Sequence, residues 1–396
     1  MNVFITGMGC VTPIGHNKHQ NIKSLKESKS GLKKPTIFQS KYASDFIFGE
    51  VDMDNATLLS VVDTNGLKGL TRTDLLALMA FEEAIQDAGL SIDEISSNKT
   101  AFISASTVGG MCLTNQLYDD SNLKSDTTEF LESYSGSAHA QQICKKHHIK
   151  GLVNVINTAC SSSANAIAYG TRLIKSGRAK RAIVGGVDSL SKYTVNGFNS
   201  LQILSNEKCT PFDDNRKGLN LGEAAGYIVL EAEDVVANKN TYAKVAGYGN
   251  SNDAYHASSM SDDATGITIA INKALESAGI SSADIDYINA HGTGTQNNDL
   301  VELTGFKTIF KTVPPFSSTK SFIGHTLGAA GAVEAIFSVF SLMEGDFYPN
   351  LNFKTPIGDL NLRPITDVVH HEDARYVMSN SYGFSGNCTS LIFEKA

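Results

Sequence analysis

An alternation of strand-like and helix-like segments, run through twice, constrains the fold most strongly. In the first part, apolar runs typical of buried strands occur at residues 3–6, 101–105, 153–156, 181–185 and 226–231. Segments of helical spacing lie between them at residues 74–88 and in a stretch that ends near 174. The second part repeats this alternation, with expected strands at residues 241–248, 285–289, 376–379 and 390–394 and expected helices at 266–278 and 333–343. Short apolar runs alternating with helices are typical of a buried sheet covered by helices. The sequence therefore predicts a layered α/β fold.

The two parts are expected to be related halves. Each ends on a similar strand, YIVLE at 227–231 and LIFE at 391–394, as a duplicated unit would. The polar segment 234–240 fits a linker, so we expect an N-terminal half over 1–238 and a C-terminal half over 239–396. The polar segment 119–137 is predicted to form a surface cap.

Charge and cysteine usage narrow the function. The 33 Lys and Arg against 41 Asp and Glu give a net charge of −8, which argues against nucleic-acid binding but allows a local basic patch for an acidic protein. No run of 18 apolar residues and no signal-like N-terminus is present, so neither a membrane span nor secretion is expected. The six Cys residues are scattered without a CxxC pair, which predicts reduced thiols in the cytoplasm.

Cys160 is the first candidate for chemistry. It lies in the segment NTACSSSA at 157–164, between a predicted strand and a predicted helix. A thiol at a helix N-terminus meets free backbone N–H groups and the positive end of the helix dipole, which we expect to lower its pKa and make it nucleophilic. The alternative is a cysteine that packs in the core.

Two histidines form the second candidate group. His291 opens HGTGT at 291–295, where the glycines let a ligand approach the backbone and the hydroxyls of Thr293 and Thr295 can bond a polar chain. His325 precedes a run of small residues that predicts a helix packed closely on a neighbour. Either histidine alone has a structural alternative.

Lys320 lies in a weakly charged stretch, and we expect Glu302 to neutralise it. A Cys with a His suggests covalent acyl transfer, whereas a protease-like pair would also need an orienting Asn or Asp. Two neutral imidazoles suit a different need, because their N–H groups can stabilise an enolate at a thioester carbonyl.

Taken in order, these motifs resemble those of elongating β-ketoacyl-acyl-carrier-protein synthases. The matching segments are 5–9, 12–15, 158–162, 185–186, 211–213, 222–223, 291–295, Lys320, 324–325 and 380–384. The resemblance implies a thiolase fold of two related βαβαβαββ halves in a five-layer αβαβα architecture. It implies an acyltransferase that condenses a Cys160-bound acyl chain with malonyl-carrier protein, in fatty-acid or related polyketide or polyene biosynthesis.

The resemblance also implies roles for individual residues. The backbone N–H groups of Cys160 and Phe384 would form an oxyanion hole, and His291 and His325 would hold the enolate. The pantetheine arm would pass Thr293 and Thr295, while Lys320 with Glu302 would hold the histidines. An acyl tunnel would be lined by Val108, Met111, Phe198 and Phe384, and the carrier protein would meet Lys68, Arg72 and Lys208.

No redox cofactor or catalytic metal is expected, because phosphopantetheine arrives on the carrier protein. Either a structural monovalent cation or a local turn is expected at Asp299 and Asn380. The resemblance implies a homodimer, or a heterodimer with a chain-length-factor-like subunit, and no membrane partner.

The chain departs from the family pattern near its end, where Ser385, Asn387 and Cys388 stand in a segment that commonly reads GFGGTN. Ser385 is expected to restrict the loop that carries Phe384. Two alternatives stay open: a ketosynthase subunit of a specialised polyene or polyketide pathway with a Cys-lacking partner, and a non-catalytic scaffold or chain-length subunit, against which the set of Cys160, His291 and His325 argues.

Overall fold

The computed structural model describes residues 1–126, 128, 130–236 and 239–396. Its first half contains, in order, β1 (Val3–Val11), α3 (Arg72–Asp87), β4 (Thr100–Ala105), α6 (Ala138–His147), β5 (Val153–Ile156), α7 (Ser162–Lys175), β6 (Arg181–Asp188) and β7 (Ala224–Ala232). The second contains β8 (Ala243–Asn252), α9 (Thr265–Ala278), β9 (Tyr287–Asn289), α10 (Gln296–Ile309), β10 (Phe316–Ser317), α12 (Ala330–Glu344), β13 (Tyr376–Tyr382) and β14 (Asn387–Lys395). Both halves read βαβαβαββ, as predicted. The expected boundary at 238 lies outside the described residues.

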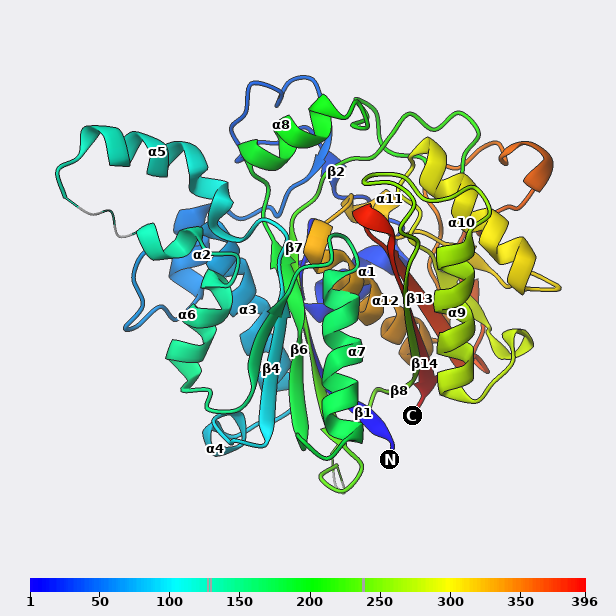
Figure 1. Cartoon of the computed structure of the whole chain (residues 1–396), viewed down its shortest axis with the longest axis horizontal. Helices are drawn as coiled ribbons and strands as arrows, with labels where there is room; N and C mark the ends of the chain where they lie inside the picture. The colour runs from blue at the N-terminus through cyan, green and yellow to red at the C-terminus, as the bar shows by residue number, and fades with distance from the viewer. Residues whose placement is uncertain (127, 129, 237–238) are drawn as a thin grey trace.

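Shorter elements decorate this frame. They are α1 (Lys18–Lys26), β2 (Leu32–Lys33), β3 (Phe48–Gly49), α2 (Asn55–Val61), α4 (Ile92–Ile95), α5 (Thr114–Leu123), α8 (Lys192–Ser200), α11 (Lys320–Ile323), β11 (Asp346–Phe347) and β12 (Val369–His370). Helix α5 covers part of the predicted cap, projects from the body in Figure 1 and buries none of its residues. Residues 127 and 129 of that cap lie outside the described part of the chain.

The strands of the two halves form one continuous sheet in the order β10-β9-β13-β14-β8-β1-β7-β6-β4-β5, and β2-β3 and β11-β12 form two separate two-stranded sheets. The order within each half is the same, and the halves meet where β1 and β8 pair antiparallel, with Phe4 opposite Lys244. Three apolar clusters fill the spaces between layers. One joins α3 and α6 to the first half of the sheet, one joins α9 and α10 to the second, and the central one contains α7 and α12 (Figure 1). The five-layer thiolase fold is therefore confirmed.

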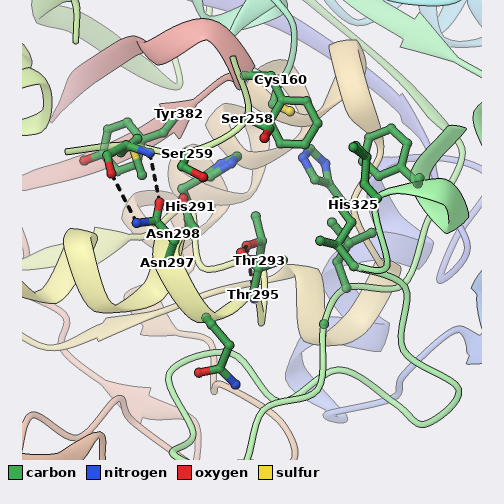
Figure 2. Close-up of a pocket in the computed structure, with 18 of the residues that line it drawn as sticks. Cys160, Ser258, Ser259, His291, Thr293, Thr295, Asn297, Asn298, His325 and Tyr382 are labelled. Atoms are coloured by element: carbon green, nitrogen blue, oxygen red, sulfur yellow. Dashed lines mark hydrogen bonds between the residues drawn. The ribbon is translucent and has the colours of Figure 1, made fainter. Parts of the chain in front are cut away.

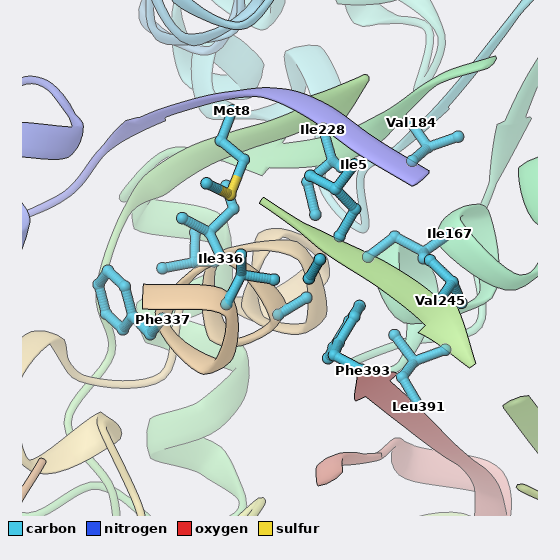
Figure 3. Packing of buried hydrophobic residues seen from close by; sticks show 14 of the residues in the cluster. Ile5, Met8, Ile167, Val184, Ile228, Val245, Ile336, Phe337, Leu391 and Phe393 are labelled. Carbon is cyan, nitrogen blue, oxygen red and sulfur yellow. The ribbon is translucent and has the colours of Figure 1, made fainter. Parts of the chain in front are cut away.

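The central layer explains an apolar stretch in the sequence. The window Leu327–Glu344 is long and apolar enough to cross a membrane by length and composition, yet 89% of it is buried inside the fold. Its residues pack against both halves of the sheet; Figure 3 shows Ile336 and Phe337 of α12 in the same cluster as Met8, Leu391 and Phe393. A helix covered on all sides is expected to be apolar on all sides.

Close packing of α7 against α12 brings the two halves of the site together. A Cβ on Gly331 would lie 2.6 Å from the Ala164 nitrogen, so only glycine permits this approach. The Ala332 N–H also donates to Ser163 Oγ at 2.8 Å. The predicted close packing of the small-residue helix is confirmed, and it sets the start of α7 beside the loop that precedes α12.

Candidate active site

Cys160 lies on a sharp turn between β5 and α7. The preceding residue, Ala159, has φ +54°, a left-handed conformation that is unfavourable for a residue with a Cβ. The hydroxyl of Ser162 accepts the Thr158 N–H at 2.9 Å and fixes the turn. The thiol is 6% exposed and faces a cavity of about 420 Å³. Strain at such a turn is typical of functional positions.

Burial, rather than the helix N-terminus, has the largest effect on the pKa of the Cys160 thiol. It raises the pKa of Cys160 to about 11, although Lys320 and the backbone N–H groups of Phe384 and Cys160 oppose it. The expected low pKa is therefore wrong for the resting site, and the thiol is protonated at neutral pH. The two N–H groups that face the sulfur are nevertheless where negative charge would be stabilised during acyl transfer.

The two histidines come from the second half of the chain and meet Cys160 at the cavity. His291 follows β9, and His325 lies between α11 and α12. Their ring centroids are 5.4 Å apart at an interplanar angle of 87°. Cys160 Sγ and one nitrogen of each ring lie within 4.8 Å of one another (Figure 2). The structure thus brings together the three residues that the motifs singled out.

The hydrogen-bond network assigns the same tautomer to both rings. The Leu327 N–H donates to His325 Nδ1 at 3.2 Å, and Lys320 Nζ lies 3.1 Å from His291 Nδ1. Because a backbone amide and an ammonium can only donate, both Nδ1 atoms accept and the ring proton sits on Nε2. Burial, followed by Lys320, lowers the pKa of both rings well below 6.5. At neutral pH the site therefore offers two uncharged N–H donors.

The partner of Lys320 is Glu334, so the predicted pairing with Glu302 is wrong. The Lys320 ammonium bonds the Glu334 carboxylate, and both side chains are 1% exposed. Glu302 instead accepts the N–H groups of His291 and Gly292, each at 2.8 Å. Sequence reasoning missed Glu334, although it is the only charged residue within 327–343, which is a signal for a buried ion pair.

The threonines line the same cavity as the catalytic candidates. Thr293 Oγ1 and Thr295 Oγ1 are 2.8 Å apart, and both line the cavity that contains Cys160. Asp299 holds this loop from behind, because its carboxylate accepts the N–H groups of Thr293 at 3.0 Å and Phe212 at 2.7 Å. Those bonds use the oxygens that a cation would need, so Asp299 does not fit the expected cation site.

Asn380 fits that expectation better than Asp299. It is fully buried on β13, and its side-chain oxygen and nitrogen have no hydrogen-bond partner among the described residues. Buried polar atoms without partners are costly, so an unpaired oxygen here is compatible with a bound cation or water.

Two aromatic rings close one side of the cavity. Phe198 and Phe384 are stacked, with centroids 5.7 Å apart, and both line it. Val108 and Met111 pack with Phe198 in one apolar cluster but do not line this cavity. Phe198 thus connects the cavity to the remaining predicted tunnel residues.

The unusual segment after Phe384 adopts a strained turn. Ser385 has φ +64°, and its N–H donates to the Ala257 carbonyl at 2.8 Å. Asn387 accepts the Ser161 hydroxyl at 2.8 Å and the Asn165 amide at 2.9 Å, which ties the segment to the start of α7. Ser385 and Asn387 therefore hold the loop that carries Phe384 against the turn that carries Cys160.

The residues predicted to contact the carrier protein differ in their exposure. Lys68 and Lys208 are exposed, as a docking contact requires. Arg72 is not available, because its guanidinium donates to Glu223 at 2.7 and 2.9 Å and its side chain is only 13% exposed. Its assignment to the carrier surface is wrong, since burial and a bidentate carboxylate hold it inside.

Comparison with known families agrees with this geometry. The N-terminal domain model of β-ketoacyl synthases matches residues 1–235, and the C-terminal domain model matches residues 242–354. The chain belongs to the β-ketoacyl synthase family. It is 30% identical over 409 residues to 3-oxoacyl-[acyl-carrier-protein] synthase 2 of Staphylococcus aureus (strain MRSA252), covering 100% of this chain and 98% of the relative. The resemblance read from the motifs is confirmed.

Solved structures of the same fold include several multi-subunit ketosynthases. The ishigamide ketosynthase/chain length factor has a TM-score of 0.94 at 27% identity, covering 100% of this chain and 99% of that one. The ketosynthase ApeO, in complex with its chain length factor from Xenorhabdus doucetiae, has a TM-score of 0.85 at 30% identity, with 100% and 98% covered. A type II ketosynthase in complex with its acyl-carrier protein has a TM-score of 0.89 at 25% identity, with 100% and 99% covered.

Proposed function

We propose that this β-ketoacyl synthase lengthens an acyl chain held on Cys160 by two carbons, taken from malonyl-carrier protein with loss of carbon dioxide. The observation that carries the proposal is the meeting of Cys160 with two neutral, Nε2-protonated histidines in one cavity. A nucleophile with two uncharged donors suits thioester exchange followed by enolate formation better than hydrolysis.

The first half-reaction loads the enzyme. Cys160 sulfur attacks the carbonyl of the acyl-carrier thioester, and the oxyanion forms beside the N–H groups of Cys160 and Phe384. The carbonyl re-forms, the bond to the pantetheine sulfur breaks, and the leaving thiolate takes the proton that Cys160 loses. Stacked Phe198 and Phe384 would have to separate to admit the chain toward Val108 and Met111.

The second half-reaction makes the carbon–carbon bond. The malonyl thioester carbonyl would accept from Nε2 of His291 and His325, with its pantetheine arm along Thr293 and Thr295. The bond to the carboxylate breaks, carbon dioxide leaves, and the electron pair enters the enolate. The enolate carbon attacks the acyl thioester on Cys160, the carbon–sulfur bond to Cys160 breaks, and the departing thiolate takes a proton from solvent. Neutral donors are required, because they stabilise the enolate without protonating its carbon readily.

The partners form a separate part of the proposal. An acyl carrier protein, which is acidic, would dock near exposed Lys68 and Lys208. β5 lies at one end of the sheet, and Val153 at its start and Leu152 just before it are 42% and 41% exposed, which favours pairing with a second chain. That chain would be a second copy or a chain-length-factor-like subunit; the ishigamide and Xenorhabdus relatives support a chain-length-factor-like subunit.

A monovalent cation at Asn380 and a cytoplasmic site of action also belong to the proposal. The side-chain atoms of Asn380, which are unpartnered within the described part of the chain, support the cation, and the free cysteines support the cytoplasmic location.

The decisive test is covalent loading. Incubation with a carrier protein that bears an acyl thioester should add the mass of one acyl group to the peptide that contains Cys160. Cys160→Ala should abolish both this adduct and condensation. Cys144→Ala, at a half-buried cysteine of α6, is the matched control and should load normally. Normal elongation by Cys160→Ala would overturn the proposal.

A further inference from the structure

A buried carboxylate outside the proposed reaction set joins two segments from different halves of the chain. Asp188 ends β6 and is fully buried. Its Oδ1 accepts from Ser106 Oγ at 2.7 Å and the Val108 N–H at 3.0 Å. Its Oδ2 accepts from Thr107 Oγ1 and the Gly328 N–H, both at 2.7 Å. All of these donors are neutral, and together they saturate both oxygens.

The Gly328 bond matters because of its neighbour. Gly328 belongs to the short turn Leu327–Ala329, which is separated from His325 only by Thr326. Leu327 has φ +54°, and its N–H is the group that donates to His325 Nδ1. A left-handed, non-glycine residue keeps this conformation only where its surroundings hold it. The Asp188 carboxylate holds the next peptide, and a Cβ on Gly328 would lie only 2.8 Å from Asp188 Oδ2.

We infer that Asp188 is a positioning residue for His325: it fixes the Leu327–Gly328 turn so that the Leu327 N–H stays on Nδ1 and the ring proton stays on Nε2. Asp188 does not line the cavity that contains Cys160. The catalytic consequence rests on the proposed function, whereas the tautomer itself does not.

Replacement by asparagine should release this arrangement. An amide has one acceptor atom and one donor atom, so Asp188→Asn must set an N–H₂ group against either the Gly328 N–H or the donors of residues 106–108. A free turn would let the Leu327 N–H leave Nδ1. The imidazole would then divide between two tautomers, and the fraction protonated on Nδ1 would present a lone pair, not a donor, to the enolate.

The experiment compares Asp188→Asn with two controls. Ser106→Ala removes one bond to Oδ1 and leaves Gly328 in place. Glu50→Gln perturbs another buried carboxylate that accepts backbone N–H groups, those of Thr36 and Ile37. Nitrogen NMR of histidine-labelled protein reads the His325 tautomer, carbon dioxide release from malonyl-carrier protein reads decarboxylation, and mass spectrometry reads acylation of Cys160.

We expect Asp188→Asn to add the Nδ1-protonated signal of His325 and to slow decarboxylation in proportion to the fraction of rings that carry it, up to about 100-fold at complete conversion, the usual loss for one oxyanion donor. Acylation should change by less than about threefold, because its oxyanion hole is elsewhere. Both controls should keep the wild-type tautomer and the wild-type ratio of the two rates.

A wild-type His325 signal in Asp188→Asn, or an equal fall of both half-reactions, would overturn the inference. Should that variant fail to fold, Gly328→Ala keeps the carboxylate but displaces the turn, and it must give the same shift and the same selective loss. Wild-type protein that neither loads acyl chains nor releases carbon dioxide would refute the proposed function. The NMR comparison would still decide the role of Asp188.

Discussion

The pairing of Lys320 can be tested by mutating its partner. Glu334→Leu removes the only carboxylate among the described residues that is bonded to the buried ammonium, and it leaves the ammonium with the His291 carbonyl at 2.6 Å and Nδ1 at 3.1 Å. Breaking a buried ion pair by deleting one member costs about 3–5 kcal/mol, because the remaining charge is uncompensated. We expect a loss of this size in the free energy of unfolding.

A double-mutant cycle separates the pair from other effects. Lys320→Met combined with Glu334→Leu leaves no unpaired charge, so the double variant should be more stable than Glu334→Leu, with a coupling energy of about 2 kcal/mol or more. The same cycle between Lys320→Met and Glu302→Gln should give a coupling energy below about 1 kcal/mol, since Glu302 bonds two backbone N–H groups instead.

Urea unfolding followed by circular dichroism measures all of these variants. Equal coupling in the two cycles, or a larger one for Glu302, would refute the ion pair seen here and restore the pairing expected from the sequence. The pH profile of carbon dioxide release provides a second measurement. Lys320→Met removes the ammonium that lowers the pKa of His291, so the acid limb of the profile should move to higher pH.

Two further perturbations follow from the same contacts. Gly383→Ala places a methyl group 2.6 Å from the Thr158 carbonyl and 3.2 Å from the Cys160 nitrogen, so acylation should fall at least about tenfold while the melting temperature changes little; an unchanged rate would show that Phe384 is not held there. Acid should destabilise the fold below pH 6.5, because burial lowers the pKa of His139 from 6.5 to about 4 and the unfolded chain takes up the proton first. Stability should be complete above pH 6.5 and fall by up to about 3 kcal/mol toward pH 4, and His139→Gln should remove that part of the slope; a flat profile between pH 7 and 5 would contradict this.

The topology was predictable because periodicity is a local property. The strand expected at 153–156 is β5, and the helix expected at 266–278 differs from α9 by one residue at its start. The motifs around Cys160, His291 and His325 were legible for a related reason, since each follows a strand or precedes a helix in the sequence itself. The Ser385 departure was also visible in the sequence, whereas its left-handed backbone, with φ +64°, was seen only in the structure.

The errors share one cause. A helix N-terminus near Cys160 can be read from the sequence, but the burial that raises its pKa is a property of the assembled layers. Arg72 reads as one more surface cation until Glu223, which lies 151 residues away, is placed against it. Both corrections depend on which side chains share an interior, and no local pattern carries that information.

By itself, the sequence determined the duplicated α/β topology and the three residues of the reactive centre, because hydrophobic period and short motifs are written along the chain. Only the tertiary structure chose Glu334 over Glu302, fixed both rings with the proton on Nε2 and connected Asp188 to the turn after His325. The physical reason is that desolvation and hydrogen-bond geometry decide charge and tautomer, and both arise only when distant segments pack together.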